Sequence, residues 1–324
     1  MTGSESKVQT GAMLRFDRVT RKYGSTIAVD DLTFEVNRGE MFGLIGPDGA
    51  GKTTSIRLLC GLLHVDKGTI RVAGHDPVKE HRAVTAKVGY LSQRFSLYGD
   101  LSIDENISFF AEIHGVADYA ARRERLLEIT QLTKFRSRLA DRLSGGMKQK
   151  LALACTLVHE PDVILLDEPT TGVDPVSRRE FWKLLSGFLA SGITILMSTP
   201  YLDEAERCSR VALLDSGRLL ALDAPNALRA SLPGTLLEVI VSNPRDAQSR
   251  LQSQGFDSQV FGDRLHVWLK DATVSVDRFS SETAPGIGAT NVRPITPSLE
   301  DVYIARLTAA QSERRAETVS AESR

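Results

Sequence analysis

The stretch GPDGAGKTT, from Gly46 to Thr54, limits the possible folds of this 324-residue chain more than any other feature. It fits the pattern G-x-x-x-x-G-K-[ST]. It follows MFGLI, an apolar run typical of a buried parallel strand, and opens a predicted helix from Lys52 to about Leu63. Glycines let the backbone turn tightly, so that its N–H groups converge on phosphate oxygens at a helix N-terminus. The loop therefore predicts a phosphate-binding site in an α/β fold.

The residues of this loop have distinct predicted roles. Lys52 reaches the β- and γ-phosphates of a bound nucleotide, and the hydroxyl of Thr53 ligates Mg²⁺. The predicted nucleotide-contacting positions are Gly46, Pro47, Asp48, Gly49, Ala50, Gly51, Lys52, Thr53 and Thr54.

A second apolar run, VILLDEP, supplies the complementary acids. It ends in Asp167 and Glu168, which places two carboxylates at the carboxyl edge of the sheet, where ligands bind in open α/β folds. Asp167 is predicted to hold Mg²⁺ through water, and Glu168 to orient and deprotonate an attacking water. An alternative is that the two acids only cap the next element. The phosphate loop favours the catalytic interpretation.

Composition narrows the class of protein. The net charge of −1 gives no support for a general nucleic-acid binder, and no nucleic-acid partner is expected. No apolar stretch approaches the roughly 18 residues that span a bilayer, and the first residues lack the apolar core of a secretory signal. Three widely spaced cysteines do not form a disulfide framework. We predict a cytoplasmic protein whose contact with any membrane is made through a partner.

Strand-like and helix-like segments alternate along the chain. DVILLDEP and GITILMST are separated by the helix-like PVSRREFWKLLSGFLAS, which indicates a parallel sheet, and MLRFDRVTRKYG suggests a strand near a sheet edge. From about Pro233 the pattern changes to that of a small α+β domain. The predicted organisation is a disordered tail at 1–12, a main domain at 13–231 with a helical subdomain at about 96–157, the α+β domain at 232–307 and a disordered tail at 308–324.

The stretch LSGGMKQK, from Leu143 to Lys150, adds a second helix N-terminus suited to an anion. Two chains facing head to tail would use both sites on one nucleotide, the phosphate loop of one chain and this helix N-terminus of the other. Here the sequence resembles the ATP-binding cassette (ABC) ATPases, whose signature is similar to LSGGQ, over about Leu14 to Ala230. The resemblance implies a P-loop NTPase cassette with a β-rich N-terminal edge, a RecA-like core and a helical insert. It also implies that ATP joins two cassettes, with the γ-phosphate contacted by Ser144, Gly145 and Gly146 of the opposite subunit.

The same resemblance assigns roles to three further residues. Tyr23 is similar to the aromatic residue that stacks on adenine, and its alternative is an ordinary strand-edge tyrosine. Gln93, in YLSQ, matches the glutamine that senses Mg²⁺ and the membrane partner. Asp174, in TGVDP, matches the aspartate that communicates across the dimer, and it also suits the N-cap of a helix that begins at Pro175.

Two other stretches resemble those of cassettes that serve drug, lipid or polysaccharide exporters: RFSLYGDLSIDENISFFAEIHG and PITPSLEDVYIARL. They imply a subunit on the inner face of the membrane that drives a separate integral membrane permease docked near Gln93 and the helical insert. The second cassette is a copy or a different protein, and the α+β domain is expected to regulate or stabilise the dimer. Two alternatives are a non-hydrolysing regulatory partner and a soluble ABC protein that acts on ribosomes or DNA. Those soluble proteins usually carry two cassettes or coiled-coil insertions, and neither is seen in the sequence.

Pro200 departs from the family pattern, in which a histidine follows Ser-Thr and hydrogen-bonds the γ-phosphate. Proline offers no donor. One interpretation is that Thr199 caps a helix and Pro200 is its first residue. The other is a slow ATP site that keeps Glu168 and the phosphate loop, within an asymmetric pair of cassettes. We favour the asymmetric pair narrowly over a homodimer with two slow sites.

Overall fold

The computed structural model describes residues 11–93, 97–270 and 274–322. Residues 1–10 of the tail predicted at 1–12 lie outside them, and Ala12 already belongs to the first strand. The chain divides into two compact units, Met1–Pro225 and Asn226–Arg324. The division falls shortly before the predicted boundary at residue 231.

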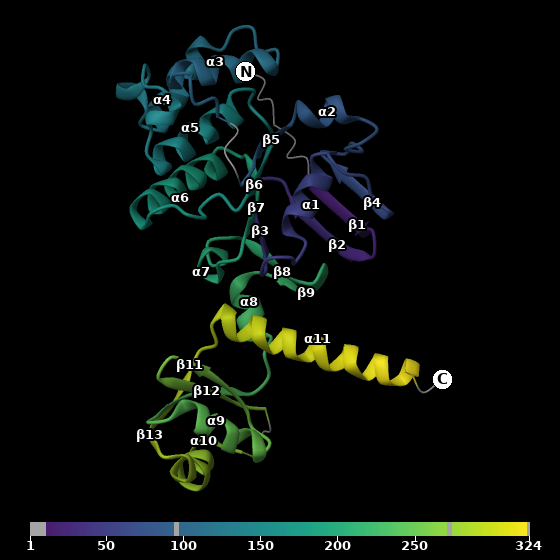
Figure 1. Ribbon diagram of the computed structural model, residues 1–324, viewed down its shortest axis with the longest axis vertical. Coiled ribbons are helices and arrows are strands. Elements are labelled where there is room, and N and C mark those ends of the chain that lie inside the picture. The colour runs from purple at the N-terminus through teal and green to yellow at the C-terminus, as the bar shows by residue number, and fades with distance from the viewer. Residues whose placement is uncertain (1–10, 94–96, 271–273, 323–324) are drawn as a thin grey trace, which may run out of the picture. The chain divides into compact units, whose positions relative to one another are not determined.

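The first unit begins with an antiparallel sheet of the order β2-β1-β4 (Figure 1). Its strands are β1 (Ala12–Tyr23), β2 (Thr26–Asn37) and β4 (Lys67–Val72). Leu14 and Phe16 of β1 are buried, and Phe16 begins a row of stacked rings with Phe34 and Phe42. The predicted edge position of β1 is wrong, because β2 and β4 pair with it on both sides. Sequence alternation reveals a buried face and not the pairing partners of a strand.

The main sheet of this unit has the order β5-β6-β7-β3-β8-β9 among the described residues, parallel except for the antiparallel β9. Every residue of β3, β6 and β7 is buried, as expected of parallel strands covered on both faces. The strand bounds are β3 Met41–Ile45, β5 Val88–Leu91, β6 Val163–Asp167, β7 Thr194–Thr199, β8 Arg210–Asp215 and β9 Arg218–Asp223.

Helices connect these strands and place loops at their carboxyl ends. The helices are α1 (Lys52–Leu59), α2 (His81–Thr85), α6 (Pro175–Ala190) and α7 (Leu202–Ala205). Helix α1 is shorter than predicted, because Gly61 adopts a positive φ of 68°. A Cβ at Gly61 would lie 2.1 Å from the carbonyl oxygen of Pro77, so the chain can turn there only with glycine.

The helical insert consists of α3 (Ile103–Ile113), α4 (Ala120–Ile129), α5 (Gly145–Leu157) and the short turns Thr133–Phe135 and Ala140–Arg142. Ser102 and Glu105 form a capping box at the start of α3. The fully buried Asn106 donates to the carbonyl oxygens of Tyr98, Leu101 and Ser102, and it accepts from the Tyr98 N–H. This amide therefore fixes the segment that precedes α3.

The second unit contains an antiparallel sheet of the order β11-β12-β10-β13, with a buried face formed by residues such as Leu237, Val239 and Val267. The bounds are α8 Pro225–Ala230 at the division, β10 Thr235–Val241, α9 Pro244–Ser253, β11 Asp257–Phe261, β12 Arg264–Leu269, α10 Val276–Arg278, a π-turn Phe279–Thr283, a 3₁₀ turn Ala284–Ile287, β13 Ala289–Ile295 and α11 Leu299–Glu322. The disordered tail predicted from residue 308 is wrong, because α11 continues to Glu322. Ala, Glu, Gln and Arg in that stretch are strong helix formers, and it contains no Gly or Pro. No helix in the described ranges combines the length and apolarity that a membrane crossing requires.

Candidate nucleotide-binding site

The phosphate loop connects the carboxyl end of β3 to α1. Gly49 and Gly51 have φ values of 81° and 95°, which side chains rarely adopt. A Cβ at Gly51 would also lie 2.4 Å from the carbonyl oxygen of Ala28, and one at Gly46 would lie 2.3 Å from that of Leu214. The loop is therefore packed so closely against the backbone of neighbouring segments that these glycines cannot be replaced without movement.

Lys52, the first residue of α1, folds back over this loop. Its side chain is 4% exposed, and Nζ donates to the carbonyl oxygens of Gly46 at 2.8 Å and Pro47 at 3.0 Å. The same ammonium lies 3.2 Å from Oε1 of Glu168. A buried lysine needs such partners, and the carboxylate offsets its charge. The amine that is predicted to meet phosphate thus sits at the centre of the loop.

The two acids lie side by side at the end of β6. Asp167 is 1% exposed, and its Oδ1 accepts hydrogen bonds from the Thr53 hydroxyl at 3.0 Å and the Ser198 hydroxyl at 2.7 Å. Glu168 is 9% exposed and has a φ of 48°, which is unusual for a residue with a side chain. A carboxylate and a hydroxyl are oxygen donors of the kind that Mg²⁺ prefers, so this pair fits the predicted metal site.

Gln93 follows β5 and reaches the same carboxylate. Its Nε2 donates to Oε2 of Glu168 at 3.1 Å, and the Thr171 hydroxyl lies 3.4 Å from that oxygen. Glu168 is therefore held between the Lys52 ammonium and the Gln93 amide. The structure brings together Gln93, Lys52, Thr53, Asp167 and Glu168, which come from the ends of two strands, β5 and β6, and the start of helix α1.

Other predicted residues lie elsewhere in the first unit. Ser144 is the N-cap of α5 and accepts from the Met147 N–H at 3.3 Å, so this signature segment opens a helix of the insert, apart from α1 (Figure 1). A Cβ at Gly146 would lie 2.2 Å from Oγ of Ser177, which explains why glycine is needed there. Tyr23 ends β1, is 44% exposed and packs under the Arg21 guanidinium.

Asp174 is the N-cap of α6, as one of its two interpretations predicts. Its carboxylate accepts from the N–H groups of Val176 and Ser177 at 3.0 Å, and Pro175 is the first helical residue. The hydrogen bonds from Ser177, together with that from Val176, lower the pKa of this carboxyl. A role of Asp174 between two cassettes stays a prediction.

The segment around Pro200 differs from the sequence prediction. Helix α7 begins at Leu202 with Tyr201 as its N-cap, so Pro200 is not the first helical residue. Thr199 is the last residue of β7. Its hydroxyl accepts from the Tyr201 N–H at 3.0 Å and donates to Oε2 of Glu204 at 2.7 Å. The hydroxyl that was predicted to cap a helix therefore bonds instead to the side chain of Glu204, five residues further along the chain.

Sequence reasoning missed Ser198 and Glu204. Ser198 bonds to both acids, and the buried Glu204 also accepts from the Thr170 hydroxyl and lies 3.7 Å from Nε of Arg178. Two signals were available in the sequence: the hydroxyl of Ser198 at the end of an otherwise apolar strand, and the acid Glu204 three residues after Tyr201. Neither spacing fits a familiar motif, so only the fold reveals these contacts.

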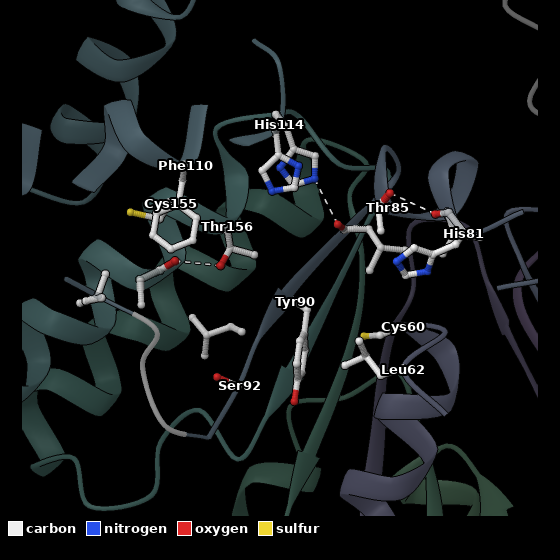
Figure 2. A pocket seen from close by; sticks show the side chains of 16 residues that line it. Cys60, Leu62, His81, Thr85, Tyr90, Ser92, Phe110, His114, Cys155 and Thr156 are labelled. Atoms are coloured by element: carbon white, nitrogen blue, oxygen red, sulfur yellow. Dashed lines mark hydrogen bonds between the residues drawn. The ribbon is translucent and has the colours of Figure 1, made fainter. Parts of the chain in front are cut away.

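A cavity of about 240 Å³ lies between the helical insert and the ends of α1 and α2. Figure 2 shows Phe110, His114 and Cys155 on one side, Cys60 and Leu62 on the other, and Tyr90 of β5 between them. The rings of His114 and His159 stack with centroids 3.8 Å apart, and His159 Nε2 lies 3.1 Å from the Val88 carbonyl oxygen. Burial and the nearby His114 lower the pKa of His159 to about 4, so this imidazole is neutral near pH 7.

The comparison with known proteins decides the family. The sequence pattern of the family described as ABC transporter matches residues 29–171. Nod factor export ATP-binding protein I of Paraburkholderia xenovorans (strain LB400) is 40% identical over 265 residues, which is 81% of this chain and 87% of that protein. The chain belongs to the ABC transporter ATP-binding proteins. The ABC protein described here thus belongs to a family of ATP-binding proteins, and ATP is the nucleotide expected at its site.

Two further similarities support this family. The probable multidrug ABC transporter ATP-binding protein YbhF of Escherichia coli (strain K12) is 42% identical over 285 residues, or 86% of this chain. The ABC protein spans only 48% of YbhF. A solved structure described as the ATP binding subunit of an ABC transporter is 31% identical, with a TM-score of 0.61 over 67% of this chain and 92% of that one. The predicted ABC cassette fold is confirmed.

Proposed function

We propose that this chain is the ATP-hydrolysing subunit of an exporter and works with a separate integral membrane permease. The observation that carries the proposal is the meeting of Glu168 with Lys52 and Gln93 at the phosphate loop, in a chain similar to proteins named for Nod factor export and for multidrug transport. These groups have the chemistry needed to bind nucleotide phosphates and to activate water.

The roles of the residues follow from their positions. The backbone N–H groups of the phosphate loop and Lys52 bind the β- and γ-phosphates, and Tyr23 stacks on adenine. Thr53, Asp167 and Gln93 are the residues that would hold Mg²⁺, which neutralises phosphate charge when it is bound. Glu168 orients the attacking water and accepts its proton. Lys52 must release this carboxylate as the phosphates arrive, because one ammonium now contacts both the loop and Glu168.

The complete site requires two cassettes. The N-terminus of α5 carries Ser144, Gly145 and Gly146 on the insert, where they are placed to meet the phosphates of a nucleotide held by another chain. ATP therefore closes a dimer with a copy of this chain or with a different cassette, and hydrolysis reopens it. Asp174 lies at the start of α6 and communicates between the two sites.

The permease docks in the cavity between the insert and the core. Leu62, which lines the cavity, is 57% exposed, and Ile113, which precedes the lining residue His114, is 61% exposed. Strand β5, which also lines the cavity, leads toward Gln93. An apolar segment of the permease is the occupant whose chemistry fits this lining. The protein is then cytoplasmic and peripheral on the inner face of the membrane, and its cargo is selected by the permease.

Membrane binding tests this proposal. The full chain is co-expressed with a candidate integral membrane permease from the same organism and recovered from washed membranes. The expected result is recovery with the permease for the wild type and for Ile27→Asp, a control at an exposed isoleucine of β2 (40% exposed). Leu62→Asp and Ile113→Asp are expected to release the chain without lowering ATP binding. Equal recovery of all four proteins contradicts docking at the cavity, and absence of wild-type binding contradicts the permease-linked function.

A second candidate function is that of a cassette that binds ATP and turns it over slowly beside a faster partner. The specific observation is Pro200, which directly follows the end of β7 next to the phosphate loop and carries no hydrogen-bond donor. Losing one preorganised donor to a transition state costs roughly 10²- to 10³-fold in rate. The signature segment of this chain would still complete the partner's site.

A further inference from the structure

We propose that Ser198 is a positioning residue that holds both acids of the ATP site through a single hydroxyl group. Ser198 lies in β7, is completely buried and pairs with Asp167 of β6. Its Oγ donates to Oδ1 of Asp167 at 2.7 Å and accepts from the N–H of Glu168 at 3.0 Å. One side chain thus contacts the predicted metal ligand and the backbone of the predicted base.

The bond to Glu168 matters because the chain leaves the sheet there in an unusual conformation. Glu168 has a φ of 48°, a conformation that costs free energy for a residue with a Cβ and persists only when its surroundings hold it. Its N–H also lies 3.2 Å from the Ser198 carbonyl oxygen. Ser198 therefore fixes the turn that directs the Glu168 carboxylate toward Lys52 and Gln93.

The bond to Asp167 orients the other acid. Ser198 of β7 and Thr53 of α1 both donate to Oδ1, so two hydroxyls from different elements hold one oxygen of this buried carboxylate. Only a group that donates and accepts at once can serve both acids. Alanine can do neither, a thiol does both weakly, and threonine keeps the hydroxyl.

Thr194 separates this role from a general need for polar groups in β7. It is also completely buried, and its hydroxyl accepts from the N–H of Gly39 at 3.0 Å at the opposite end of the strand. Removing either hydroxyl leaves a buried N–H with a poorer partner, and both changes are expected to lower stability. Only the change at Ser198 is expected to disturb the acids.

The experiment uses the purified full chain with Ser198→Ala, Ser198→Thr and the matched control Thr194→Ala. Two quantities are measured for each protein. The first is turnover at saturating ATP with Mg²⁺, and the second is the affinity for a fluorescent ATP analogue, determined once with Mg²⁺ and once with chelator. A hydrogen bond to a charged group is worth about 1.5–3 kcal/mol, so Ser198→Ala is expected to lower kcat roughly 10- to 100-fold. It is also expected to remove most of the gain in affinity caused by Mg²⁺, with unchanged affinity in chelator. Ser198→Thr restores both quantities, and Thr194→Ala leaves both unchanged.

Two results overturn the proposal: turnover and Mg²⁺ response of Ser198→Ala that match the wild type, or losses no larger than those of Thr194→Ala. Where Ser198→Ala does not fold, Ser198→Cys keeps the side-chain size and carries the same expectation. The inference rests on the ATP hydrolysis of the proposed function. A wild-type chain that is no faster than Glu168→Gln contradicts that hydrolysis, whereas the effect of Mg²⁺ on nucleotide affinity still decides the role of Ser198.

Discussion

Replacing Pro200 by histidine tests whether this position limits the rate of ATP hydrolysis. The residue follows Thr199, which pairs with Ile45 at the start of the phosphate loop, and the Gly46 N–H lies 3.4 Å from the Thr199 carbonyl oxygen. On the neighbouring strand, the Glu168 N–H reaches Ser198. Residue 200 therefore leaves the sheet edge between the phosphate loop and the base.

The expected gain follows from the missing donor. A preorganised donor to the transition state is worth about 10²- to 10³-fold in rate, so Pro200→His is expected to raise kcat by about 10²-fold. Replacing proline makes the unfolded chain more flexible, and this lowers the free energy of unfolding by only about 0.4–1 kcal/mol. The variant is thus expected to be slightly less stable and much faster, a combination that stabilisation of the fold cannot produce.

The assay is steady-state phosphate release by the purified chain, with thermal unfolding measured in parallel. Pro200→Ala is the matched control, because it frees the backbone in the same way and adds no side-chain donor. It is expected to lose similar stability and to keep the wild-type rate. A rate for Pro200→His within twofold of the wild type, in a folded protein that binds ATP, refutes the reasoning and leaves Pro200 as a structural residue of the turn before α7.

Three further predictions concern the loop, the buried acid and the cavity. Gly51→Ala is expected to abolish ATP binding and to lower the free energy of unfolding by about 1–3 kcal/mol, because the φ of Gly51 is 95° and the carbonyl oxygen of Ala28 blocks a Cβ. Nucleotide titration measures the first effect, and denaturant unfolding measures the second. Glu204→Ala removes the acceptor of two threonine hydroxyls and the ion-pair partner of Arg178, and it is expected to lower the free energy of unfolding by about 3 kcal/mol in chemical denaturation. The control Asp203→Ala, at an exposed residue, is expected to change this free energy little. The pKa of His159 is lowered by burial, so the stability that its neutral form contributes is present above about pH 6.5 and is lost as the pH falls toward 4. Thermal unfolding between pH 7.5 and 4 is expected to show this loss in the wild type and a smaller one in His159→Phe; equal losses would contradict it.

Local sequence patterns were sufficient for the centre of the site. The phosphate loop lies within nine consecutive residues, and the two acids directly follow an apolar strand. Short local motifs therefore predict both the phosphate-binding chemistry and its position at the end of strands in an α/β sheet. The structure brings Lys52 and Glu168 within 3.2 Å, although 116 positions separate the two residue numbers. The parallel topology explains this meeting, since the carboxyl ends of such strands share one edge.

The errors arose where the local sequence pattern fitted more than one structure. Thr199 had the sequence of a helix cap, but Glu204 and the pairing of β7 determine its conformation. Ser198 read as the end of a buried strand, and its double role depends on the register between β6 and β7, which a single sequence does not reveal. The end of α11 was predicted as disordered because its composition is polar, although the same residues favour helix.

The most direct test of ATP hydrolysis by this chain compares phosphate release by the purified wild type and by Glu168→Gln, with ATP binding measured for both. We expect equal ATP binding by the two proteins and a wild-type turnover that is slow but clearly above that of Glu168→Gln, because Glu168 is held at the phosphate loop by Lys52 and Gln93. A wild type that binds ATP and releases phosphate no faster than Glu168→Gln would contradict the assignment of Glu168 as the base.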